Sequence, residues 1–147
     1  MKKQTLIKSL LILLPVLAVG LATTGDSVIV FDSLTGVTEY YSYFEMAPET
    51  QWQTLPPLAA MLAAISGILA AVYMVKKKEW CLKGIVGTTM ASACAAVIPV
   101  VQQGDVRMIP NVGLPIFMMV NCLVAYHFLK HPEKTEEKKP PRKVKRK

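Results

Sequence analysis

The segment from Pro56 to Val75 constrains the fold of this chain more than any other part of the sequence. It reads PPLAAMLAAISGILAAVYMV, twenty residues without a charge. As an α-helix it would be about 30 Å long, which matches the hydrocarbon thickness of a bilayer. Small residues recur in it at every fourth position, and this spacing lets a second helix approach closely in lipid. They are Ala59, Ala63, Gly67 and Ala71. The segment therefore predicts the central helix of a membrane bundle.

Three other segments without Asp, Glu, Lys or Arg, at 9–25, 84–104 and 108–129, predict three further spans in this chain of 147 residues. The third span repeats the small-residue spacing at Gly87, Ala91 and Ala95, so we expect spans two and three to pack as an antiparallel hairpin. The predicted fold is all-α, a four-transmembrane-helix bundle with a small extracellular β-hairpin loop. We expect helices at about 6–24, 55–75, 84–103 and 110–130, an outer loop at 25–54, and a disordered basic cytoplasmic tail at 130–147.

The first span also fits a second interpretation. A basic start (MKKQTLIK), an apolar run and small residues at Gly20 and Ala22 are typical of a secretory signal peptide as well. We favour a retained helix, kinked at Pro15, because other spans follow it. Both interpretations deliver Thr23 to the outside.

The distribution of positive charge predicts the orientation. The net charge is +7, with three Lys or Arg residues at the amino terminus, four at 76–83, nine in the tail and only Arg107 elsewhere. Cytoplasmic segments carry the excess of Lys and Arg, so we expect both termini in the cytoplasm. The short MKK start and compact loops favour a bacterial plasma membrane. The basic tail should lie near anionic lipids of the inner leaflet, and the segregation of charge away from aromatic residues argues against nucleic-acid binding.

The outer loop changes from helical to extended patterning. It contains SVIVFDSLTGVTEYYSYF, which is rich in strand formers, with turn residues ending at Gly36. We expect a hairpin that pairs 28–31 with 37–43. A lone hairpin is marginally stable in water, so it should lie on the bundle or on a partner.

Clustered aromatic residues in this loop have two interpretations. They form a recognition surface, since aromatic side chains are enriched at interfaces, or they cover the outer helix ends at headgroup level. The residues are Tyr40, Tyr41, Tyr43, Phe44 and Trp52.

Four spans with a β-loop after the first make the layout similar to that of the claudin and peripheral-myelin group. That group carries a tryptophan and paired cysteines in its first outer loop. Here Trp52 has no cysteine near it, so the resemblance is one of layout and implies no function.

Groups that perform chemistry in membranes are missing from the spans. No Asp, Glu, Lys or Arg lies inside them, and ionisable groups at mid-membrane depth mark proton relays and substrate pathways. We therefore expect neither an enzyme nor a proton-coupled carrier, and neither a cofactor nor a metal. Asn121 is the most polar group within a span, and we interpret it as a contact that holds helices together, with a pore-lining or ligand-binding role as the alternative.

The sequence thus favours an accessory or scaffold subunit that acts through helix–helix and outer-loop contacts, with a membrane protein or further copies of itself as partner. The alternative is an oligomeric pore or carrier for a small neutral solute, lined by Ser66, Thr88, Ser92 and Asn121.

Overall fold

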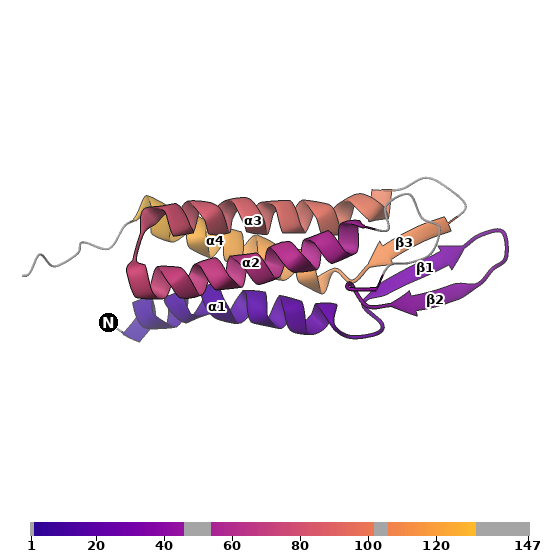
Figure 1. Ribbon diagram of the computed structural model, residues 1–147, viewed down its shortest axis with the longest axis horizontal. Coiled ribbons are helices and arrows are strands. Elements are labelled where there is room, and N and C mark those ends of the chain that lie inside the picture. Colours follow the sequence, from indigo (N-terminus) through magenta and orange to yellow (C-terminus); the bar gives the residue numbers. More distant parts are fainter. Residues whose placement is uncertain (1, 46–53, 102–105, 132–147) are drawn as a thin grey trace, which may run out of the picture.

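The computed structural model describes residues 2–45, 54–101 and 106–131. It contains four helices and a small three-stranded sheet (Figure 1). The helices are α1 (Lys2–Ala22), α2 (Leu55–Lys76), α3 (Glu79–Val97) and α4 (Gly113–Lys130), and a 3₁₀ turn η1 (Ile98–Val101) follows α3. The strands are β1 (Val28–Asp32), β2 (Thr38–Tyr41) and β3 (Val106–Pro110).

The helices lie side by side along one long axis, and the sheet stands at one end of them (Figure 1). The start of α1, the connection between α2 and α3, and the end of α4 all lie at the opposite end, which we call the inner end. That connection is tight because Lys77 adopts a left-handed conformation, φ 48°, and donates its N–H to the carbonyl of Tyr73 at 2.8 Å.

Three helical stretches are long and apolar enough to cross a membrane by length and composition: Leu55–Lys76, Glu79–Val101 and Gly113–Lys130. The apolar part of α1 is shorter, Leu6–Ala22. The third helix begins at Glu79 rather than near residue 84, so Cys81 is buried inside a helix and not part of a loop. It leaves α-helical geometry at Val97 because Pro99, in η1, has no N–H to donate.

The sheet is larger than the hairpin expected from the sequence. The hairpin is present, with Val28 opposite Tyr41 and Phe31 opposite Thr38. However, β3 adds a third antiparallel strand on the other side of β1, with Val28 also opposite Pro110, so the strand order is β2-β1-β3. The fourth helix begins at Gly113, three residues after the expected start near residue 110, because Pro110 ends β3.

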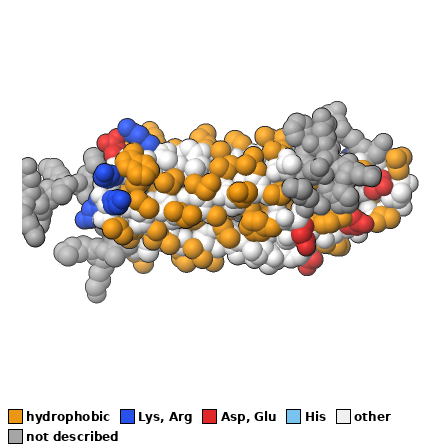
Figure 2. Space-filling view, viewed as in Figure 1, with side chains coloured by type: hydrophobic (Ala, Val, Ile, Leu, Met, Phe, Trp, Pro, Cys, Tyr) orange, Lys and Arg blue, Asp and Glu red, His pale blue; other side chains and the backbone are white. Residues whose placement is uncertain are grey.

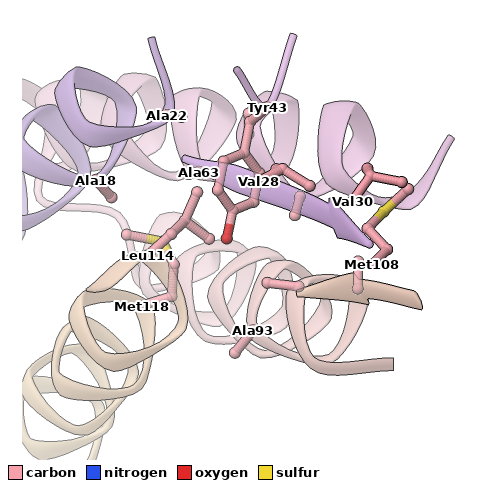
Figure 3. Close-up of a cluster of buried hydrophobic side chains, with 14 residues drawn as sticks. Ala18, Ala22, Val28, Val30, Tyr43, Ala63, Ala93, Met108, Leu114 and Met118 are labelled. Atoms are coloured by element: carbon pink, nitrogen blue, oxygen red, sulfur yellow. The ribbon is translucent and has the colours of Figure 1, made fainter. Parts of the chain in front are cut away.

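Two apolar clusters fill the bundle. The outer cluster joins the sheet to the outer halves of the helices, as Figure 3 shows for Tyr43, Val28, Ala63 and Leu114. The inner cluster contains Leu11, Ala70, Tyr73, Cys81, Leu82, Ile85, Ala125 and Phe128. The predicted disordered tail lies mostly outside the described residues.

Candidate functional site

A buried polar layer separates the two apolar clusters. On α2 Ser66 lies between Ala63 of the outer cluster and Ala70 of the inner one, and on α4 Asn121 lies between Met118 and Ala125. Thr89 takes the corresponding place on α3. All three side chains have no exposed surface. The bundle therefore carries polar groups from three helices at the middle of its length.

The hydroxyl groups near this layer have hydrogen-bond partners. Ser66 donates to the carbonyl of Ala63 at 2.7 Å, and Thr89 donates to the carbonyl of Ile85 at 2.7 Å. One turn farther out, Ser92 donates across the helix interface to the carbonyl of Ala59 at 2.7 Å. Ser92 thus joins α3 to α2 through a side-chain hydrogen bond.

Asn121 differs from these hydroxyl groups. Its Nδ2 and Oδ1 atoms are buried, and neither has a hydrogen-bond partner among the described residues. The structure therefore does not show the interhelical hydrogen bond that its position in the sequence suggested. An unpaired buried carboxamide costs about 1–3 kcal/mol in proteins.

The small residues of α2 face two different environments. Ala59 and Ala63 are fully buried in the outer cluster. Gly67 approaches α1 so closely that a Cβ atom there would lie 3.3 Å from the Cβ of Pro15. Ala71 is exposed and, with Gly67, lines an apolar cleft of about 340 Å³ between α1 and α2. The stripe is thus used mainly inside the molecule.

The small residues of α3 are, in contrast to those of α2, mostly exposed. Ala95 is buried in the outer cluster, but Gly87 and Ala91 are exposed. No atom lies within 4 Å of the position that a Cβ would take at Gly87. Cys94 continues the exposed line at the next turn. Most of the predicted stripe therefore faces away from the rest of the described bundle.

The sheet is held firmly to the helices through Tyr43. This side chain is fully buried at the centre of the outer cluster (Figure 3). Its hydroxyl donates to the carbonyl of Asn111 at 2.9 Å, and its N–H donates to the carbonyl of Ala22 at 3.0 Å. Burial raises the pKa of the Tyr43 phenol above its usual value. Of the predicted aromatic surface, Tyr43 is thus an anchor and is not available to a partner.

One side of the sheet is largely apolar and exposed to solvent. Side chains alternate along β1, so Val28 and Val30 face the outer cluster while Ile29 and Phe31 face away. Ile29 lies opposite Tyr40 on one neighbouring strand and Ile109 on the other. Tyr40 is 58% exposed. Phe31 lies opposite Thr38 and Arg107, so a hydroxyl and a guanidinium share this side of the sheet. We call its apolar part, Ile29, Phe31, Tyr40 and Ile109, the outer face.

The other predicted aromatic residues lie elsewhere. Phe44 is exposed, while Tyr41 is half-buried and donates its hydroxyl to Glu39. That hydrogen bond raises the pKa of Tyr41. Trp52 lies outside the described residues. The sequence reasoning missed Ile29, Phe31 and Ile109. The uninterrupted apolar run VIVF was the signal that would have found the first two, because successive side chains of a strand point to opposite faces and both faces of β1 are therefore apolar.

Charge is concentrated at the two ends of the molecule. In Figure 2 the lysines gather at the inner end and acidic side chains at the sheet end. Within 2–45, 54–101 and 106–131, no group of three or more His, Cys, Asp or Glu residues is placed to hold a metal ion.

Comparison with known proteins gives no relative from which a role is transferred: the chain matches no protein-family model, no curated protein and no solved structure.

Proposed function

We propose that this protein is a multi-pass accessory subunit of a membrane complex, and that it presents its outer sheet to a protein partner outside the membrane. In this proposal all four helices span the bilayer and both termini are cytoplasmic. The observation that carries the proposal is the outer face, a cluster of exposed apolar side chains beside Arg107 on a sheet that is firmly anchored to the bundle.

The anchoring matters because binding costs conformational entropy. A surface that is already ordered loses less freedom when a partner docks, so more of its contact energy appears as affinity. Tyr43 and the backbone bond from Asn111 N–H to the carbonyl of Ser27, 2.7 Å long, fix the base of the sheet before any partner arrives. Contiguous exposed apolar side chains on such a platform are typical of interaction sites.

Tyr40→Ser tests the proposal. Buried aromatic anchors at interfaces contribute about 2 kcal/mol or more, so the substitution should weaken the complex by at least about tenfold. The measurement is native mass after gentle extraction of the full chain from native membranes, with the dissociation of the complex followed on dilution. Tyr126→Ser is the matched control, because Tyr126 is 53% exposed at the inner end of α4.

A complex that survives Tyr40→Ser as well as Tyr126→Ser would overturn the proposal. A native mass equal to that of one copy of the chain, in both the original and the variant protein, would also overturn the proposal. Circular dichroism on each variant establishes that the bundle is intact, so loss of the complex is not confused with unfolding.

The pore or carrier alternative gains no support from the placement of its predicted lining. Ser66, Ser92 and Asn121 are fully buried between helices of one copy, and Thr88 is half-buried with its hydroxyl bonded to the carbonyl of Gly84. A passage formed between copies would run past the outer surfaces of the helices and would not reach them.

A further inference from the structure

One positive charge lies beside the apolar side chains of the outer face. Arg107 is directly opposite Phe31 across the β1–β3 pair, and facing residues of neighbouring strands project from the same side of a sheet. The Arg107 side chain is exposed. Its guanidinium forms no ion pair or hydrogen bond with the residues that the structure describes. The outer face therefore borders a permanently charged group whose N–H donors are available to a partner.

The nearest carboxylates of the sheet are directed elsewhere. Side chains alternate along a strand, so Asp32 and Glu39 project from the side of the sheet opposite to Arg107. The Asp32 carboxylate accepts a hydrogen bond from the Thr35 hydroxyl at 2.7 Å, within its own turn. The Glu39 carboxylate accepts a hydrogen bond from the Tyr41 hydroxyl. These acidic groups thus do not neutralise Arg107 across the sheet.

A partner that covers the outer face removes water from Arg107 as well as from Phe31. A guanidinium that loses water without gaining an acceptor costs free energy, because it remains ionised. A carboxylate accepts a pair of parallel N–H bonds from one guanidinium, and such charged pairs are stronger than neutral hydrogen bonds. We infer that the occupant of the outer face is a separate protein that places an Asp or Glu side chain beside its own apolar patch, where the carboxylate pairs with Arg107. This inference rests on the proposed function and adds the chemistry of the partner.

The composition of this side of the sheet argues against a second copy of the chain seated face to face. Each copy would bring another Arg107 and no carboxylate. The other paired residues on this side of the sheet are Ile29, Phe31, Thr38, Tyr40 and Ile109. Both guanidinium groups would lose water without an anionic acceptor, and their like charges would repel each other.

The height of Arg107 above the helices argues against a lipid phosphate as its acceptor. The base of the sheet is held at the helix ends, where the N–H of Tyr43 donates to the carbonyl of Ala22, the last residue of α1. Strand β1 begins at Val28, and Phe31, opposite Arg107, lies about 10 Å farther along it. The strands extend beyond the helix ends roughly along the long axis of the bundle (Figure 1). The headgroup layer on each side of a bilayer is only about 5–7 Å thick, so Arg107 lies beyond it when the helices cross the membrane.

Site-specific photo-crosslinking in native membranes identifies the occupant. A photoreactive phenylalanine analogue replaces Phe31 in the full chain, because Phe31 is directly opposite Arg107. The adduct is sized, and its cross-linked segment is sequenced. We expect an adduct with another protein whose cross-linked segment contains Asp or Glu.

Charge reversal on both sides of the contact tests the pairing. Arg107→Glu should weaken the complex at least about tenfold on dilution, because the partner's carboxylate then meets a like charge. Replacement of that carboxylate by Arg should restore most of the affinity that Arg107→Glu loses. Arg107→Lys keeps the charge without the planar, bidentate geometry, and it should weaken the complex severalfold.

Matched variants separate this pair from total charge and from folding. Arg107→Gln removes the charge, so it should weaken the complex and also reduce the effect of salt on its dissociation. Lys78→Glu makes the same charge reversal on an exposed side chain at the inner end, and it should leave the affinity unchanged. Circular dichroism on each variant establishes that the sheet and the helices are intact.

The other outcomes contradict separate parts of the proposal. An adduct of twice the chain mass, an adduct with lipid, or the absence of any adduct overturns the inferred occupant. The loss or survival of the complex in Tyr40→Ser then decides independently whether the proposed function stands. A protein adduct whose complex resists both Arg107→Glu and Arg107→Gln overturns the acidic character of the partner and leaves the proposed function standing. Failure of every carboxylate reversal in the partner to restore the affinity does the same.

Discussion

Asn121 is a buried carboxamide, and its effect on stability has a sign that the structure predicts. Because neither of its polar atoms has a partner among the described residues, Asn121→Leu should remove a desolvation cost and stabilise the bundle, by about 1 kcal/mol. The measurement is the free energy of unfolding of the reconstituted protein.

Ser92→Ala is the matched variant with the opposite expected sign. It deletes the hydrogen bond from Ser92 to the carbonyl of Ala59, and interhelical bonds of this kind contribute about 0.6 kcal/mol on average in membranes. If Asn121→Leu instead destabilises the protein by a similar amount, the carboxamide has a partner in the bilayer and the predicted sign is wrong.

These two residues show what a sequence tells at the scale of single side chains. A polar residue within an apolar helix is recognisable, and its burial is a reasonable expectation. Whether the side chain bonds to its own helix, as Thr89 does, or to a neighbouring helix, as Ser92 does, depends on the rotation and height of the neighbouring helix. Neither quantity is encoded locally.

At the scale of helices, the two glycine positions of the small-residue stripes should respond differently to the same change. Gly67→Leu places its side chain against Pro15, where even a Cβ atom would be 3.3 Å away, so we expect loss of about 1–3 kcal/mol of bundle stability. At Gly87 no atom lies within 4 Å of the position of a Cβ, so Gly87→Leu should leave the stability of the single copy nearly unchanged. Thermal unfolding of both reconstituted variants makes the comparison.

Gly20→Leu is the control, because Gly20 is also on a helix with nothing within 4 Å of its Cβ position. If Gly87→Leu lowers the mass of the native particle and Gly20→Leu does not, the open side of α3 also contacts a neighbour. Equal destabilisation by Gly67→Leu and Gly87→Leu would contradict the close packing of α2 on α1.

The strands illustrate the limit of sequence reasoning at this scale. The β1–β2 hairpin is local, since a turn and two extended runs stand next to one another in the sequence. In contrast, β3 pairs with a strand about eighty residues earlier, and its five residues, VRMIP, show no clear alternation and end in proline. Pairing over that separation depends on the helices bringing the segments together, so the sequence alone does not distinguish this strand from the approach to α4.

For the whole molecule, the sheet and the lysine-rich turn lie at opposite ends of one long body (Figures 1 and 2). This separation of charge lets the excess of Lys and Arg on the cytoplasmic side predict the orientation in the membrane. Lys76, Lys77 and Lys78 stand at the inner end, and the acidic sheet stands at the other. Residues at the hairpin tip should therefore be outside the cell and residues of the α2–α3 turn inside it.

Single cysteines introduced at Leu34 and Lys77 test this orientation, in a chain whose three native cysteines are replaced by alanine. A membrane-impermeant maleimide should label position 34 in intact cells and position 77 only after permeabilisation, because both side chains are exposed but at opposite ends. Labelling of both positions in intact cells would show mixed orientation. Labelling of position 77 alone would show that the protein is inserted in the opposite orientation. The outer face, and with it the proposed partner, would then lie in the cytoplasm. The orientation therefore decides on which side of the membrane the proposed partner would lie, and the positive charge at the inner end predicts that it lies outside.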